Sequence, residues 1–362
     1  MRSAARAPFV LLGIASLLIG MAGGLARIGY AVPLPLGSAL EHHGALMVGG
    51  FFGTLISLER AVALGSSWTY AGPIAAGLSA LLITGGALAL GEALLLAGSL
   101  VLCAASATVW RKQPTLFNAV LTSGALCWAI GNGLRLGGAP VAGAVAWWIA
   151  FFVLTIAGER LELNRLLPPK PHATRAFVVI AAVLVVGCAL ASVRAPAGVF
   201  VFAFALLAMG GWLLRNDVAR RTIRARALTR YIAASLLSGY VWLLLGAGLM
   251  MGESALAGAG LVYDAALHAI FVGFVFAMVF GHAPIIFPAL MQIRIRYTPW
   301  LYVPLGLLHA SLILRIAGDL AAFPTWRLAG ALGNVAAILL FALTMVTCAL
   351  LGRRAGVAPH NR

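Results

Sequence analysis

Charged residues make up only 9% of this 362-residue sequence, and acidic residues are scarcest, with nine Asp and Glu against 25 Lys and Arg. Soluble domains carry about 25% charged residues, so the composition excludes an ordinary soluble domain. Hydrophobic residues make up 62%. They come in runs of roughly 18 to 25 residues, the length of a helix that crosses a hydrocarbon core of about 30 Å. Such long, uniformly apolar runs exclude membrane-spanning strands and predict helices.

Cysteines and polar catalytic motifs are also scarce. The four cysteines all lie in apolar runs, without metal-site spacing, and are interpreted as small apolar fillers: Cys103, Cys127, Cys188 and Cys348. The chain has no nucleophile–base constellation, no phosphate-binding loop and no carboxylate pair arranged for hydrolysis. Whether the protein is an enzyme stays open, and any chemistry would belong to a cofactor.

The apolar runs predict an all-α polytopic membrane protein with twelve transmembrane helices in three four-helix units. The first run could be misread as a signal peptide, but it is too long for an h-region and lacks a clear cleavage site. We expect one membrane domain over residues 1–362, with repeat units at about 40–136, 140–251 and 260–351 and the helix at 8–30 closing the bundle. The spans are expected at about 8–30, 40–64, 70–90, 93–110, 115–136, 140–161, 176–194, 197–215, 228–251, 260–286, 299–318 and 326–351.

The net charge of +16 predicts orientation rather than nucleic-acid binding. With both termini in the cytoplasm, 20 of the 25 basic residues fall inside, most densely at residues 215–230. The remaining basic residues fall outside, where five acids offset them: Arg27, Arg135, Arg194, Arg315 and Arg327. This positive-inside bias favours a multi-pass protein of the cytoplasmic (inner) membrane. The expected partner of the basic excess is the anionic bilayer surface.

An internal repeat links the second and sixth predicted spans. "FFGTLISLER" at 51–60 matches "FFVLTIAGER" at 151–160 without a gap, and "FVFAMVFGHA" at 274–283 is a weaker third copy. The copies lie four helices apart, which is the basis for three four-helix units related by a pseudo-threefold axis. Functional sites often lie at the interface between such repeats.

The inner ends of the first two copies carry charges at membrane depth: Glu59, Arg60, Glu159 and Arg160. Unpaired carboxylates are costly there. One interpretation is structural cross-pairing, Glu59 with Arg160 or Glu159 with Arg60. The other is a cytoplasmic gate or proton-entry site.

Histidines gather at the predicted outer face. His42 and His43 follow Glu41 at the start of the second span, and His268 lies four residues after Asp264 at the start of the tenth. If the two spans are equivalent, these imidazoles can face one centre. Imidazole suits haem iron, copper and zinc, and a nearby carboxylate can orient a ligating ring. Interfacial histidines bonded to water or headgroups are the alternative.

Two further histidines lie inside spans. His282 is a further candidate metal ligand, but it is about 21 Å along the helix from His268, too far to share a compact metal centre with it. It precedes Pro284, so its ring could serve a backbone carbonyl freed by the proline. His309 is either a ligand of a second centre or a polar contact between helices. His172 and His360 are expected to be solvated.

The chain resembles two families. Twelve helices in three units, with histidines at the outer ends of helices two and ten, resemble the catalytic subunit of haem-copper oxidases. The motifs "EHHGALMVGGFFG" and "LHAIFVGFVFAMVFGHAP" are similar to segments of the NnrS family, twelve-span proteins linked to haem, copper and nitric oxide. The resemblance implies ligands at His42 or His43 and at His268. Spans six and seven lack the further histidines of oxidases, which argues against an oxygen-reducing centre.

The leading hypothesis is therefore a membrane protein that binds haem, copper or both through outer-face histidines and handles nitric oxide or electrons. A redox partner or a small gas ligand is the expected partner, and nucleic acid is not expected. Helical phase favours His43 over His42 as the ligand opposite His268, with Glu41 and Asp264 as supporting carboxylates. The alternatives are a twelve-span secondary transporter and a metal-binding accessory protein.

Overall fold

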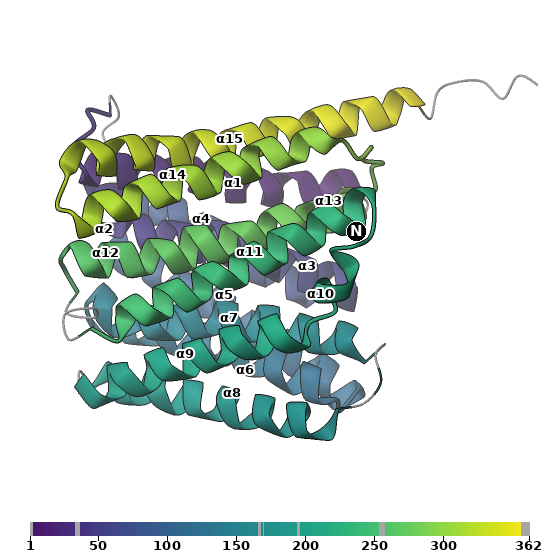
Figure 1. Ribbon diagram of the computed structural model, residues 1–362, viewed down its shortest axis with the longest axis horizontal. Coiled ribbons are helices and arrows are strands. Elements are labelled where there is room, and N and C mark those ends of the chain that lie inside the picture. Colours follow the sequence, from purple (N-terminus) through teal and green to yellow (C-terminus); the bar gives the residue numbers. More distant parts are fainter. Residues whose placement is uncertain are drawn as a thin grey trace, which may run out of the picture. The chain divides into compact units, whose positions relative to one another are not determined.

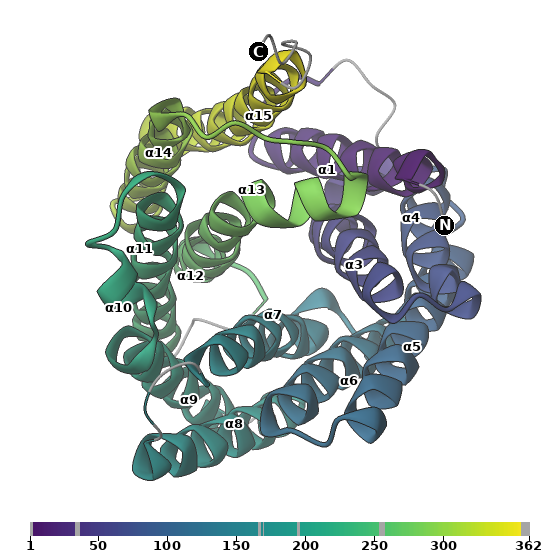
Figure 2. The ribbon, with the colours of Figure 1, turned by 90° about the vertical axis from the view of Figure 1, so that its right-hand side faces the viewer.

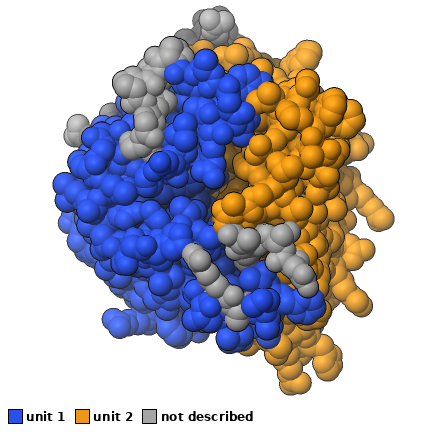
Figure 3. Space-filling model, turned by 90° about the vertical axis from the view of Figure 1, so that its left-hand side faces the viewer, with its two compact units in different colours: residues 1–162, 181–202 blue, residues 163–180, 203–362 orange. Residues whose placement is uncertain are grey.

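The computed structural model describes residues 3–32, 37–165, 168, 170–193, 196–252 and 258–355. Every regular element in these ranges is a helix, and the chain divides into two compact units, residues 1–162 with 181–202 and residues 163–180 with 203–362 (Figure 3). The boundary at residue 162 falls inside the second predicted repeat unit, so the compact units do not follow the repeat. The predicted single membrane domain and its repeat limits stay predictions.

The helices of the two units are as follows. Unit 1 contains η1 (Ser3–Arg6), α1 (Ala7–Arg27), α2 (Gly37–Ala45), η2 (Leu46–Gly53), α3 (Thr54–Leu64), η3 (Ser67–Tyr70), α4 (Ala71–Thr84), α5 (Leu88–Lys112), α6 (Leu116–Leu136) and most of α7 (Val141–Asn164). Unit 2 contains α10 (Ala219–Thr222), α11 (Ala227–Met250), α12 (Leu261–His268), η4 (Ala269–Phe276), α13 (Ala277–Met291), η5 (Pro299–Leu301), α14 (Tyr302–Leu320) and α15 (Pro324–Ala355). Each unit also takes part of α8 (Pro171–Ser192) and of α9 (Pro196–Asn216).

Among the described residues, ten helices are long and apolar enough to cross a membrane. They coincide with ten of the twelve predicted spans. The other two predicted spans, at 70–90 and 115–136, form the helices α4 and α6, which do not meet the same measure of length and hydropathy. Large apolar side chains point outward from these helices, and Leu11 and Leu343 are each 63% exposed. Such exposure is costly in water and favourable in lipid.

Two helices contain a π-helical segment at the same place in the repeat. η2 lies within the continuous helix that begins as α2, and η4 within the one that begins as α12. The offset of 223 residues that relates Phe51 to Phe274 also relates Leu46 to Ala269, the first residues of η2 and η4. The corresponding part of α7 is regular α-helix. The widened turn is thus shared by the second and tenth predicted spans.

Aromatic rings packed against small residues form the cores. In unit 1, Trp128 stacks on Phe151 at a centroid distance of 5.2 Å, and its indole covers Gly53, where a Cβ would overlap it. In unit 2, Phe280 stacks on Phe341 at 3.9 Å. The absence of a side chain at such glycines lets helices approach closely, which is how helices without a hydrophobic driving force associate in lipid. Neighbouring helices α14 and α15 of unit 2 lie side by side in two views (Figures 1 and 2).

Candidate functional site

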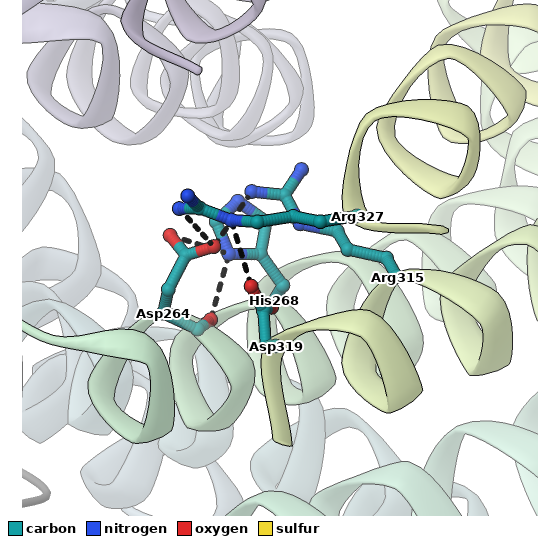
Figure 4. A network of polar contacts seen from close by, with 5 residues as sticks. All are labelled: Asp264, His268, Arg315, Asp319 and Arg327. Carbon is teal, nitrogen blue, oxygen red and sulfur yellow. Dashed lines mark hydrogen bonds and ion pairs between the residues drawn. The ribbon is translucent and has the colours of Figure 1, made fainter. Parts of the chain in front are cut away.

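The predicted outer end of unit 2 carries a cluster of five polar side chains (Figure 4). We call it the Asp264 cluster; it comprises Asp264 and His268 from α12, Arg315 and Asp319 from α14, and Arg327 from α15. The Asp264 carboxylate Oδ2 accepts from Arg315 at 2.9 Å and from Arg327 at 3.2 Å. Arg327 Nε lies 2.7 Å from Asp319 Oδ1. Two guanidinium groups and two carboxylates balance each other there.

Burial makes this balance necessary. The side chain of Asp319 is fully buried and that of Arg315 is 9% exposed, while those of Asp264 and Arg327 are 22% and 28% exposed. A buried charge without a partner costs several kcal/mol, so each of these ions depends on the others. The cluster fastens α12, α14 and α15 to one another at one end.

His268 is held by this cluster through one side of its ring. Its Nδ1 lies 2.8 Å from the backbone carbonyl oxygen of Asp264 and 3.4 Å from the Asp264 carboxylate. A carbonyl only accepts, so Nδ1 carries the proton and donates. Nε2 is then the unprotonated nitrogen, and it has no hydrogen-bond partner among the described residues. This is the arrangement of a histidine that ligates metal through Nε2, with its other nitrogen fixed by a carbonyl or carboxylate.

His282, on α13, also bonds a backbone carbonyl of its own helix through Nδ1. Its Nδ1 donates to the carbonyl oxygen of Met278 at 2.6 Å. The carbonyl that loses its helical donor to Pro284 is that of Phe280, four residues before the proline. The ring therefore bonds a backbone carbonyl in the preceding turn, as predicted. The bonded carbonyl is that of Met278, however, and not the one that the proline frees. Its role as a metal ligand stays a prediction.

His309 forms the polar contact between helices that was one of its two predicted roles. Trp242 Nε1 of α11 donates to His309 Nδ1 at 2.9 Å, and the rings stack with centroids 6.3 Å apart. Since an indole only donates, the proton of the imidazole is on Nε2, which lies 2.9 Å from Ser238 Oγ. Both nitrogens are engaged by protein, so a metal could bind His309 only by displacing one of these partners.

In unit 1, His42 and His43 lie on α2, just before η2, and both are half-buried. The ring of His43 faces α1 at Gly24, where a Cβ would lie 3.6 Å from His43 Cδ2. Glu41 is exposed. His42 and His43 belong to unit 1 and His268 to unit 2, and the pairing of His43 with His268 stays a prediction.

The predicted cross-pairs, Glu59 with Arg160 and Glu159 with Arg60, stay predictions. Phe52 and Phe152 meet edge to face at 4.9 Å, and the charge of Glu59 interacts with those of Glu159 and of Arg60. The two helices contact through equivalent faces, so equivalent residues meet, and like charges approach each other.

Sequence reasoning placed Arg315 and Arg327 at the outer face but missed their contact with Asp264, and it missed Asp319 altogether. Residue spacing could have indicated that Asp319 belongs with Arg315, because the two lie four residues apart on one helix face in an otherwise apolar run. Within each unit, the described residues contain no group of three or more His, Cys, Asp or Glu side chains placed to hold a metal ion.

Comparison with known proteins identifies one family. The family model described as a domain of unknown function (DUF8744) matches residues 6–350, and the chain therefore belongs to this family. Comparison with curated proteins gives no match.

Proposed function

We propose that this member of the DUF8744 family is a twelve-span membrane protein that binds a haem group through His268, and that it handles nitric oxide or electrons. The observation that supports it is the position of His268, whose Nδ1 is fixed by the Asp264 carbonyl while Nε2 is left without a protein partner. Asp264 is itself held by Arg315 and Arg327. A ring oriented by such contacts is prepared to ligate a metal.

The donor set favours haem over a copper ion held by protein alone. A protein-only copper or zinc site takes three or more side-chain ligands, and no such group is found among the described residues of either unit. Haem iron receives four ligands from its own ring and needs only one or two from protein. His268 would be one protein ligand of the haem, and His43 or His42 is the predicted second one. The bound haem would supply redox chemistry or a site for a diatomic gas.

Two helices must be added to the ten apolar ones to give twelve spans in three four-helix units. α6 runs antiparallel to α5, because Asn118 near its start bonds Gln113 beyond the end of α5, and Arg135 near its end bonds Glu92 near the start of α5. α4 and the preceding η3 together span about 29 Å at helical rises of roughly 1.5 and 2 Å per residue. Both helices are therefore long enough to cross the hydrocarbon core.

An absorbance spectrum with metal analysis of the detergent-purified protein tests the proposal. We expect a Soret band that His268→Ala abolishes. His172→Ala, at an exposed histidine of α8, is the matched control and should keep the band. A colourless protein with bound copper or zinc would support the accessory-protein alternative instead.

A colourless and metal-free protein would support the transporter alternative, which has one observation in its favour. The long helix Leu261–Met291 is irregular in its middle, where η4 widens the turn and Pro284 and Pro288 follow within α13. Transporters place substrate sites at interrupted helices near the bilayer centre. A substrate-dependent flux in proteoliposomes, together with no cofactor, would decide for this function.

A further inference from the structure

Unit 2 contains a cavity of about 520 Å³ at the end opposite the Asp264 cluster. It lies beside the first turns of α11, at the end of the molecule that the charge bias predicts to be cytoplasmic. Four of its lining residues carry polar groups: Arg226, Arg230, Tyr297 and Tyr302. Its polar lining is thus two arginines and two tyrosines, which offer hydrogen-bond donors.

No counter-charge serves the two arginines. Arg226 and Arg230 are exposed, and neither forms a hydrogen bond or an ion pair with a residue that the structure describes. The nearest acid along the chain, Asp217, is buried, and both of its carboxylate oxygens already accept hydrogen bonds. One accepts from Tyr240 Oη at 2.5 Å and the other from the backbone N–H of Ala219 at 2.7 Å. The cavity therefore presents positive charge without any acidic lining residue.

The aromatic residues place the cavity at a lipid–water boundary. Tyr297 and Tyr302 flank Trp300, which is 72% exposed, in the segment that leads into α14. Exposed tryptophan and tyrosine at helix ends are typical of the membrane interface. Arg230 and Tyr302 both line the cavity, so guanidinium and phenol groups converge on the same space. Phosphate oxygens are the anionic groups that such forked and hydroxyl donors fit.

We propose that this cavity is a specific site for a phosphate-bearing headgroup of an anionic lipid, with Arg226 and Arg230 as its principal ligands. Basic pockets at the cytoplasmic ends of membrane helices bind anionic headgroups in this way. The inference is independent of haem binding, since the Asp264 cluster lies near the other end of α14, the one helix that contributes described residues to both sites. A soluble phosphate compound offers the same chemistry, and the experiment separates the two sources.

Titration of the full-length protein in an uncharged detergent, followed by native mass spectrometry, tests the site. The probes are phosphatidylglycerol, phosphatidylcholine and inorganic phosphate. We expect phosphatidylglycerol to bind more tightly than phosphatidylcholine. The double variant Arg226→Gln, Arg230→Gln should bind phosphatidylglycerol roughly 30-fold more weakly, because each basic residue contributes about a fivefold factor. Inorganic phosphate should not displace the lipid.

The matched control removes two charges from the same loop without touching the cavity. Arg221→Gln, Arg224→Gln should retain the affinity of the unaltered protein within about threefold, because the detergent has no charged surface that acts at long range. Both double variants should keep the same melting temperature. Equal affinity of the cavity variant and the unaltered protein, or equal losses in both variants, would overturn the site. Displacement by millimolar inorganic phosphate would overturn the lipid as its ligand.

Discussion

Asp264 is the residue on which the outer end of unit 2 depends. Its carboxylate accepts from two guanidinium groups while its backbone carbonyl accepts from the His268 ring. Loss of the carboxylate would leave Arg315, which is 9% exposed, without the anion to which it donates, whereas the carbonyl would still hold the imidazole. The side chain thus stabilises the helices, and the backbone of the same residue orients the histidine.

Asp264→Asn is therefore expected to destabilise the protein by about 3–5 kcal/mol, because it strands buried positive charge. The measurement is thermal unfolding in detergent. The double variant Asp264→Asn, Arg315→Gln should recover part of this loss, since the stranded charge is removed as well. If the two single changes simply add in the double variant, the ion pair does not carry the stability assigned to it.

At the scale of elements, the two π-helical segments are the clearest sign of the repeat. They share register through the offset of 223 residues, which also aligns Glu41 with Asp264 and Gly50 with Gly273. His268 then aligns with Ala45, so the histidines of the two helices are not equivalent positions. π-Helical turns are rare in proteins, and those that occur often lie at functional sites. The widened turns therefore point to the same two helices as the histidines do.

Gly273→Ala tests how closely η4 depends on its small residues. A Cβ at Gly273 would overlap the Trp242 indole, whose N–H donates to His309. We expect destabilisation by about 1–3 kcal/mol, as in other overpacked cores, and a change in tryptophan fluorescence. Gly248→Ala, on α11 with no neighbour within 4 Å of the added Cβ, is the control and should have little effect. Equal melting temperatures of the two variants would contradict the close packing of η4 on α11.

The approach of Glu59 to Glu159 leads to the expectation that a substitution stabilises the protein, in contrast to the two destabilising changes above. Burial disfavours a charged carboxylate at Glu59, and the charge of Glu159 repels it where the two copies of the repeat meet, while the charge of the neighbouring Arg60 attracts it. Glu59→Gln should therefore stabilise the protein, by an amount of order 1 kcal/mol. The exposed Glu41→Gln serves as a charge-matched control without an expected gain. A lower melting temperature for Glu59→Gln would mean that this carboxylate has a favourable partner.

Helices were predictable because each needs only local information, a long apolar run. The runs at 8–30 and 140–161 correspond to α1 and α7 within a few residues. Contacts between helices were not predictable in the same way. The cross-pairs of Glu59 and Glu159 were expected from charge alone, but Phe52 and Phe152 fix which faces meet. Likewise, the tautomer of His268 is set by the carbonyl of Asp264 and that of His309 by the indole of Trp242. Composition and spacing do not reveal these contacts.

At the scale of the whole chain, the two predicted sides of the membrane differ in how many basic residues they carry. They also differ in whether the basic residues described below form ion pairs with acids. Three basic residues predicted to lie outside form ion pairs with acids: Arg135 with Glu92, Arg315 with Asp264, and Arg327 with Asp264 and Asp319. Arg194 and His360 lie outside the described residues. The arginines of the 215–230 loop have no such acidic partners among the described residues, because Asp217 is committed to Tyr240. These three outer charges are thus neutralised locally, and the charge of the 215–230 loop is left for the lipid surface.

This asymmetry predicts that the 215–230 loop faces the cytoplasm, since unpaired basic residues close to membrane helices are retained on that side. Two single cysteines test it: Arg224→Cys in the loop, and Gly137→Cys in the exposed turn after α6. Both are introduced in a Cys103→Ser background, because Cys103 is the partly exposed native cysteine and the other three are buried. In intact spheroplasts, an impermeant maleimide should modify Gly137→Cys, and Arg224→Cys only after permeabilisation. The reverse pattern would place the basic loop and its proposed lipid site outside, and with them would fall the assignment of the Asp264 cluster to the outer face.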